Sequence, residues 1–198
     1  MRRLDGRVCL VTAASAGIGL AIVRRFAAEG ARVVAVDLAP YPDAVPADGP
    51  IVPIQGDMTS AADVRRAVQT CIARFGALHV LVNGVADATP ALPITELDDA
   101  LWDRALRTNV TSAFLASKAA LPHLIAAGGG VIINIASQLG IAAQPGRSVY
   151  CASKAALIQF TKVLALDHAR QGIRVNALSP GAVITPRLLS RYGTPEAT

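Results

Sequence analysis

The sequence predicts an α/β fold in which a doubly wound parallel sheet carries helices on both faces. Short apolar runs rich in Val and Ile recur along the chain, as in strands that are buried on both sides. Longer helical stretches lie between these runs, and a glycine follows where most of them end. Because strand and helix alternate throughout the 198 residues, we expect one domain over residues 1–198.

The elements follow one another in a regular order. The predicted strands are residues 7–11, 32–36, 51–54, 79–82, 131–135 and 173–178. The predicted helices are residues 18–29, 61–75, 98–127 and 149–171, of which the third makes two helices or one bent one. Gly30, Gly76 and Gly172 suit left-handed C-caps. Residues 39–50 are rich in Pro, Asp and Ala and are predicted to form a surface loop.

Composition excludes several classes of protein. Hydrophobic residues make up 53% and charged residues 17%, which excludes a disordered chain. The apolar runs are too short to cross a bilayer, so no membrane partner is expected. The first residues lack the apolar segment of a signal peptide, which favours the cytoplasm. The net charge is +5, but the Lys and Arg residues are scattered, so we expect no nucleic-acid partner.

The thiol and imidazole side chains do not suggest a metal site. Cys9, Cys71 and Cys151 lie in different elements without CxxC spacing, and we expect them to be reduced. Cys151 adjoins Tyr150 but is interpreted as a small residue that packs at a helix start. The three histidines lack the spacing of metal ligands and are expected to be structural or exposed.

A small-residue turn between the first strand and the first helix predicts a dinucleotide site. Small side chains let the backbone approach a pyrophosphate, and a helix N-terminus offers it unpaired N–H groups. Asp37 ends the second strand about 20 residues later, where an acid binds ribose hydroxyls and repels a 2′-phosphate; the alternative is a solvated strand end. We therefore expect NAD, with NADP less favoured. The candidate contacts are Thr12, Ser15, Ala16, Gly17, Ile18, Gly19, Asp37 and Leu38.

Tyr150 and Lys154 are candidates for proton transfer. They lie four residues apart at the start of the last long helix and so share one face. A neighbouring ammonium favours the phenolate form that a tyrosine needs as a base. Ser137 follows the fifth strand, at the strand end where open α/β sheets bind ligands. The alternatives are a surface pair for Tyr150 and Lys154 and a capping or turn role for Ser137.

With these motifs the chain resembles the short-chain dehydrogenase/reductase family, from residue 4 to about residue 185. The resemblance implies a Rossmann-like fold and a TGxxxGxG turn, here with Ala13 in place of the first glycine. Alanine there requires a negative φ or a strained backbone. The resemblance also implies hydride transfer between NAD(H) and a small alcohol or carbonyl substrate, in a homodimer or homotetramer. An NAD(H)-binding protein with little activity is the alternative.

The family pattern assigns further roles. It implies a catalytic tetrad of Asn109, Ser137, Tyr150 and Lys154, in which Lys154 also binds the nicotinamide ribose and Asn109 holds a water; a helix bend or buried polar contact is the alternative for Asn109. The remaining implied cofactor contacts are Asp57, Met58, Asn83, Gly84, Pro180, Gly181, Val183 and Thr185. Asp57 has the alternative of a helix-start acid, and Asn83 that of a brace for the sheet.

Periodicity fades after Pro180 and Gly181. Residues 185–198 are predicted to form an irregular loop or a short helix, as part of a substrate loop. Compared with the family pattern, the C-terminal part of the domain is expected to be shortened. Substrate identity is expected to depend on residues 86–94, 138–147 and those after 185, with Asp87, Gln138, Gln144 and Arg147 as possible polar contacts.

Overall fold

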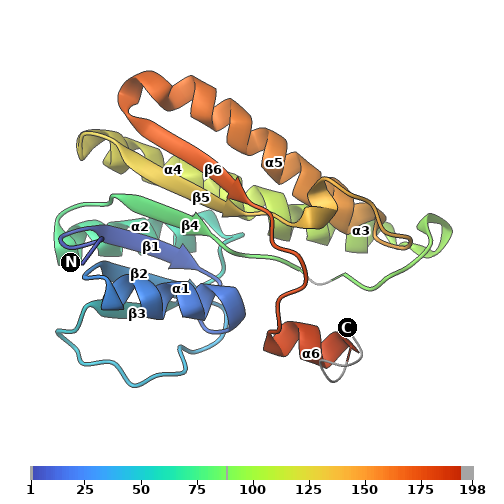
Figure 1. Cartoon of the computed structure of the whole chain (residues 1–198), viewed down its shortest axis with the longest axis horizontal. Helices are drawn as coiled ribbons and strands as arrows, with labels where there is room; N and C mark the ends of the chain where they lie inside the picture. Colours follow the sequence, from blue (N-terminus) through green and yellow to red (C-terminus); the bar gives the residue numbers. More distant parts are fainter. Residues whose placement is uncertain (1, 88, 193–198) are drawn as a thin grey trace.

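The core of the molecule is a six-stranded parallel sheet in the order β3-β2-β1-β4-β5-β6 (Figure 1). The computed structural model of the chain describes residues 2–87 and 89–192. The strands are β1 (Val8–Thr12), β2 (Arg32–Asp37), β3 (Ile51–Gln55), β4 (Val80–Asn83), β5 (Gly130–Ile135) and β6 (Ile173–Leu178). The strand order reverses between β1 and β4, where Leu10 pairs with Leu81. Ligands of open α/β sheets bind outside the carboxyl ends of the strands at this reversal.

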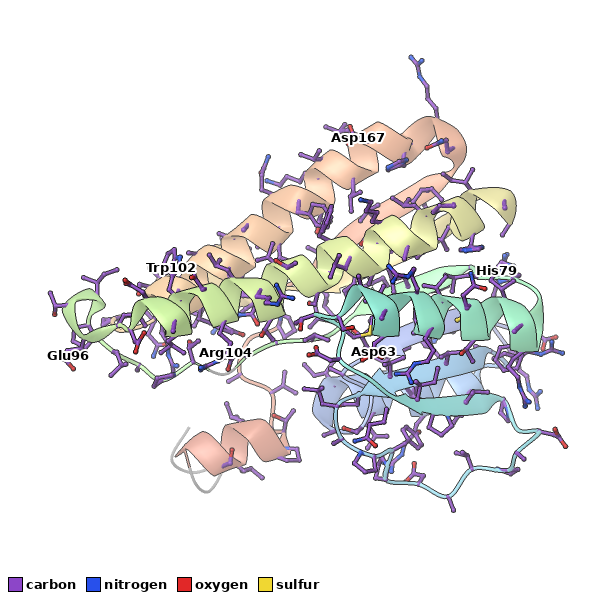
Figure 2. All side chains as sticks on the ribbon, turned by 180° about the vertical axis from the view of Figure 1, so that it is seen from behind. Asp63, His79, Glu96, Trp102, Arg104 and Asp167 are labelled. Carbon is purple, nitrogen blue, oxygen red and sulfur yellow. The ribbon has the colours of Figure 1, made fainter. Side chains whose placement is uncertain are left out.

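Helices cover both faces of the sheet. On one face lies α1 (Gly17–Ala28), whose Val23 is buried in a cluster with Val11 and Val33. Three helices lie side by side on the other face (Figure 2): α2 (Ala61–Phe75), α4 (Ser112–Ala126) and α5 (Ser148–His168). Strands with apolar side chains on both faces account for the continuous Val and Ile runs in the sequence. The predicted doubly wound α/β fold is confirmed.

The long third helical stretch is continuous but irregular. It consists of α3 (Asp99–Leu106), the π-helical segment η2 (Arg107–Thr111) and α4. A π turn admits one extra residue per turn, so it changes the direction of the side chains that follow. Of the two predicted forms, the uninterrupted helix is the one observed, with its irregularity at Asn109.

Polar residues account for the small differences at the strand ends. β1, β2 and β4 extend through Thr12, Asp37 and Asn83, which a search for apolar runs leaves out. His79 lies outside β4, and its Nδ1 accepts a hydrogen bond from the backbone N–H of Val8 at 3.0 Å. Burial and the nearby Arg7 lower the pKa of His79, which favours the neutral imidazole that accepts this bond. The structural interpretation of His79 is confirmed.

The remaining connections frame one end of the sheet. The predicted surface loop joins β2 to β3, and α6 (Pro186–Tyr192) follows the segment that leaves β6 and runs across the carboxyl ends of the strands (Figure 1). Predictions for residues 193–198 lie outside the described residues. One helical stretch, Ser148–Gln171, is long and apolar enough to cross a bilayer. This is weak support for a membrane span, since core helices pass the same test, and this helix packs on the sheet.

Candidate active site

A cavity of about 910 Å³ lies at the carboxyl ends of the strands, at the reversal point between β1 and β4. Thr12 joins these two strands at its floor, because its Oγ1 donates to the Val82 carbonyl at 3.3 Å and accepts from the Gly84 N–H at 2.9 Å. A Cβ on Gly84 would lie 2.6 Å from the Thr12 carbonyl oxygen, so only glycine fits there. Close packing of the segment after β4 against β1 therefore requires glycine at position 84.

The turn after β1 approaches the start of α1 very closely. A Cβ on Gly19 would lie 1.9 Å from the Ala13 carbonyl oxygen, and Gly17 has a φ of +53°. Ala16 caps α1 without a side-chain hydrogen bond, and the first turn of the helix contains no acid. The N-terminal N–H groups of α1 thus face the cavity without a side-chain acceptor, which suits an anionic group such as a pyrophosphate.

Ala13 adopts a left-handed conformation, with a φ of +55°. Of the two possibilities raised by the sequence, a negative φ or strain, the second is observed. It is the one non-glycine residue with positive φ among residues 2–87 and 89–192. Such a conformation costs about 1–2 kcal/mol for a residue with a Cβ.

Two aspartates line the end of the cavity nearest β2 and β3. Asp37 accepts hydrogen bonds from the N–H of Ser15 at 2.9 Å and of Ala39 at 3.2 Å, so it is tied to the turn rather than simply solvated. Asp57 accepts from both the N–H and the Oγ1 of Thr59, at 2.8 and 2.9 Å. Asp57 therefore shapes the start of α2 and also borders the cavity, so both of its proposed roles are compatible with its position.

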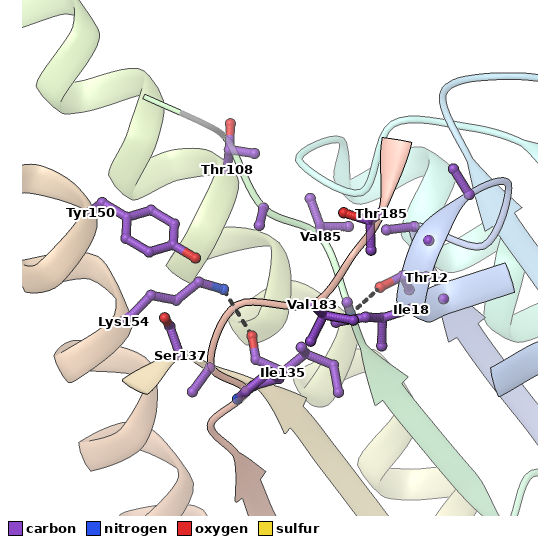
Figure 3. A pocket seen from close by; sticks show the side chains of 18 of the residues that line it. Thr12, Ile18, Val85, Thr108, Ile135, Ser137, Tyr150, Lys154, Val183 and Thr185 are labelled. Atoms are coloured by element: carbon purple, nitrogen blue, oxygen red, sulfur yellow. Dashed lines mark hydrogen bonds between the residues drawn. The ribbon is translucent and has the colours of Figure 1, made fainter. Parts of the chain in front are cut away.

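Ser137, Tyr150 and Lys154 line the other end of the same cavity (Figure 3). Lys154 is 1% exposed, and its Nζ donates to the Ile135 carbonyl at 2.8 Å, at the end of β5. The same Nζ lies 5.9 Å from the centroid of the Tyr150 ring. Ser137 is buried, and its Oγ accepts from the Leu139 N–H at 3.1 Å, so it also caps the 3-10 turn η3 (Gln138–Gly140).

Asn109 and Asn83 do not line the cavity. Asn109 is buried; its Oδ1 accepts from the Asp87 N–H at 2.6 Å and its Nδ2 donates to Ser153 Oγ at 2.9 Å. The Nδ2 of Asn83 donates to Asn134 Oδ1 at 2.8 Å, between β4 and β5. Both amides therefore brace the framework, as their structural alternatives held, while Gly84 borders the cavity. The proposed water-holding role of Asn109 stays a prediction.

The segment after β6 closes one side of the cavity. The Pro180 carbonyl accepts from the Gln138 N–H at 3.0 Å, which ties this segment to the turn that holds Ser137. Thr185 Oγ1 accepts from the Leu188 N–H at 3.2 Å at the start of α6. The remaining predicted cofactor contacts border the cavity: Ser15, Ala16, Ile18, Leu38, Met58, Gly181 and Val183. Of the possible substrate contacts, Gln138, Gln144 and Arg147 line it and Asp87 does not.

The residues of the wall that sequence reasoning did not assign include Arg104, Arg107 and Thr108. Arg104 Nε donates to Asp87 Oδ2 at 3.1 Å, and Arg107 Nη2 donates to the Thr59 carbonyl at 3.2 Å. Arg107 and Thr108 follow Arg104 by three and four residues, so the three residues share one helix face. This spacing was the feature of the sequence that could have identified them. No metal-binding cluster of His, Cys, Asp and Glu occurs within the described part of the chain.

The three cysteines are not among the residues that line the cavity. Cys9 and Cys71 are buried, and burial raises the pKa of each thiol to about 12. Cys151 is half-buried, and all three are free thiols, as expected.

Comparison with known proteins agrees with this geometry. Residues 7–192 match the family model described as short chain dehydrogenase. The 2-(R)-hydroxypropyl-CoM dehydrogenase of Xanthobacter autotrophicus is 39% identical over 96% of this chain and 80% of its own. The cis-4-hydroxycyclohexanecarboxylate dehydrogenase of Sinomonas cyclohexanicum is 40% identical, over 91% of this chain and 74% of its own.

A solved structure shows the same fold. It is a short-chain dehydrogenase/reductase from Burkholderia xenovorans, 39% identical, with a TM-score of 0.91 over 97% of this chain and 78% of its own. The sequence-based resemblance is thereby confirmed. The chain belongs to the short-chain dehydrogenase/reductase family, whose members are oxidoreductases that act on alcohol and carbonyl groups of small molecules with nicotinamide cofactors.

Proposed function

We propose that this protein transfers a hydride between NAD(H) and a secondary alcohol or ketone, with Tyr150 as the general acid and base. The observation that carries the proposal is the shared cavity. It joins the turn at the start of α1 to Ser137, Tyr150 and Lys154. A pyrophosphate site and a proton-transfer group thus lie in one enclosure at the reversal point of the sheet.

Each side chain has a separate task. Ser137 Oγ donates a hydrogen bond to the substrate oxygen. In the oxidation direction the Tyr150 phenolate accepts the hydroxyl proton, and reduction reverses this step. Lys154 is held by the Ile135 carbonyl with its ammonium near the Tyr150 ring, so it stabilises the phenolate. When bound, the nicotinamide ring supplies the carbon that accepts or returns the hydride.

We propose that the dinucleotide carries no 2′-phosphate. The Asp37 carboxylate lies at the end of β2 and is held by the Ser15 N–H, beside the turn that would receive the pyrophosphate. A carboxylate there accepts hydrogen bonds from ribose hydroxyls and repels a 2′-phosphate. Arg104 and Arg107 also border the cavity, but they lie in α3 and η2 rather than in the turn beside Asp37. The contacts of Asp37 therefore support NAD over NADP.

Relatives indicate which substrates to try first. One acts on a hydroxycyclohexanecarboxylate, and a D-threitol dehydrogenase of Mycolicibacterium smegmatis is 40% identical over 92% of this chain. A 4-formylbenzenesulfonate dehydrogenase of Comamonas testosteroni is 37% identical over 96%. We propose that the substrate here is likewise a small polar alcohol or carbonyl compound.

The test is a panel of such alcohols and ketones, followed through NADH absorbance with NAD and with NADP. Tyr150→Phe should lower turnover at least about 100-fold, the usual contribution of a general acid–base group, while NADH still binds. Tyr41→Phe is the matched control, because its hydroxyl has no hydrogen-bond partner in the described structure and lies outside the cavity. NADH binding without turnover of any panel member would support the alternative, a cofactor-binding protein without efficient chemistry.

Assembly and location are proposals of the same kind. Phe114 and Phe160 pack edge-to-face between α4 and α5, and Phe114, Val163 and Leu166 expose 44%, 46% and 80% of their surface. We propose that a second copy covers this face in a homodimer or homotetramer. Sedimentation should give a particle of at least two chains. We also propose a cytoplasmic location, which cell fractionation tests.

A further inference from the structure

Arg147 is a buried cation in the wall of the cavity. It is 5% exposed, and Arg147 and Lys154 are the buried charged residues among the side chains that the structure describes. It precedes Tyr150 by three residues and lies immediately before α5. Moving a cation out of water costs several kcal/mol unless strong interactions offset this cost. The chain therefore places a second positive charge in the wall of the cavity that Tyr150 lines.

The guanidinium is held in a fixed orientation. Its Nη1 donates to the Thr89 carbonyl at 2.7 Å, in the loop between β4 and α3. The adjacent Gly146 has a φ of +72°, and its carbonyl accepts from the Leu92 N–H at 3.0 Å. Two contacts thus dock the start of α5 against this loop. A guanidinium presents five N–H donors in a planar fork that matches a carboxylate or sulfonate.

The carboxylates of the cavity lie at one end of it. Among the described residues, those of the lining are Asp37 and Asp57, at the ends of β2 and β3, and Arg107 reaches the same end through the Thr59 carbonyl. Tyr150 and Arg147 lie beyond β5, on the far side of β1 and β4. At about 4.8 Å per strand, the three steps from β2 to β5 separate Asp37 from the reacting end by about 14 Å. The lining at the reacting end is therefore positive.

From this arrangement we infer that the substrate carries a carboxylate or sulfonate, and that Arg147 binds it. This rests on the proposed function, and it narrows the substrate class to anionic alcohols and carbonyl compounds. Because Arg147 and Tyr150 line the same cavity, one small molecule can carry both the anionic group and the reacting carbon. Arg147 acts as a substrate-binding and specificity residue.

The proposed anion site can be tested without turnover, by comparing the binding of an anionic ligand with that of its neutral analogue. The NADH complex is titrated calorimetrically with cyclohexanecarboxylate against cyclohexanecarboxamide, and with benzenesulfonate against benzenesulfonamide. Each pair differs in charge and little in shape. The protein should bind at least one anion about 10- to 100-fold more tightly than its neutral partner, the range of a charge-assisted hydrogen bond. Arg147→Gln should remove this preference and Arg147→Lys should restore part of it.

Arg170→Gln is the control for general charge effects, since Arg170 is exposed in η4 (Ala169–Gln171), outside the cavity lining. It should keep the preference. If Arg147 only anchors the loop, Arg147→Gln will lower Tm and weaken both members of each pair equally. That result overturns the inference, and so does a protein that prefers no anion in either pair.

Turnover separates the two proposals. A wild-type protein that binds anions through Arg147 but oxidises neither 4-hydroxycyclohexanecarboxylate nor threitol would refute the proposed function and leave the anion site standing. A protein that oxidises 4-hydroxycyclohexanecarboxylate and its amide with the same ratio of kcat/KM values before and after Arg147→Gln would refute the anion site alone.

Discussion

Gly19 offers the sharpest test of the cofactor turn, through the substitution Gly19→Ala. The new Cβ would lie 1.9 Å from the Ala13 carbonyl oxygen and 2.8 Å from its carbon. Ordinary contact begins at 3.4 Å, so the shortfall is about 1.5 Å. Both neighbours are backbone atoms, which cannot rotate away as a side-chain tip would. The start of α1 must therefore move relative to the turn.

Two effects of definite size should follow. Overpacking costs about 1–3 kcal/mol, which for a chain of this size lowers Tm by roughly 2–12 °C. A misplacement of about 1 Å can cost about 100-fold in catalytic rate. We expect a loss of NADH affinity of similar size, because the N–H groups at the start of α1 move with the helix. NADH fluorescence titration and thermal unfolding measure the two effects.

Gly76→Ala is the matched control. Gly76 also becomes alanine, at a φ of +78°, but nothing lies within 4 Å of the new Cβ. It should cost about 1–2 kcal/mol of strain and leave NADH affinity unchanged. The reasoning is refuted if Gly19→Ala binds NADH within threefold of the wild type, or if Gly76→Ala loses as much affinity.

Three other substitutions probe the same framework. Ala13→Gly should relieve about 1–2 kcal/mol of strain against about 0.4–1 kcal/mol of added unfolded-state entropy, so urea unfolding should show a gain of up to about 1.5 kcal/mol; a loss would contradict the strained φ. Asp37→Ser should raise the ratio of NADP to NAD turnover, and an unchanged ratio would remove Asp37 from cofactor selection. Hydrogen bonds from Arg3 and Arg25 lower the pKa of Glu29 to about 2, so its stabilisation is complete above pH 4.5 and is lost as pH falls towards 2. Glu29→Gln should flatten the decrease in Tm over that interval, and an identical acid profile would show that these contacts do not persist in solution.

Most of the fold follows from local patterns in the sequence. A parallel strand buried on both faces needs an uninterrupted apolar run, which holds for β1 and β4. The edge strand β6 instead alternates buried and exposed residues over its first four positions, and all six strands were predicted to within one residue. The active-site cavity followed from a topological rule, because residues at the carboxyl ends of parallel strands meet at one edge of the sheet. This rule brought together Ser137 and the turn after β1, which are far apart in sequence.

The sequence did not predict in the same way which polar side chains line the cavity and which are buried between the helices and the sheet. From the sequence, the side chains of Asn109 and Asn83 could either line the cavity or be buried in the framework. Their hydrogen-bond partners decide between the two, and those partners are brought close only by the fold. The π turn at Asn109 is also a tertiary effect, since the Asn109 amide spans from the Asp87 N–H to Ser153. The sequence identified Arg147 as a polar residue near the substrate loops, but it did not predict that Arg147 is buried.

The hidden amides explain how a largely aliphatic protein holds its reactive helix in place. Ser153 Oγ accepts a hydrogen bond from Asn109 Nδ2 and donates one to the Tyr150 carbonyl at 2.8 Å. Further along α5, Thr161 Oγ1 accepts from the Asn134 amide at 2.8 Å, and Asn134 in turn accepts from Asn83. These two attachment points are eight residues apart, or about 12 Å along the helix. Apolar contacts alone would allow α5 to slide or rotate, because they lack direction, whereas two directional bonds this far apart fix both its rotation and its height. The position of Tyr150 in the cavity therefore depends on buried residues that do not line it.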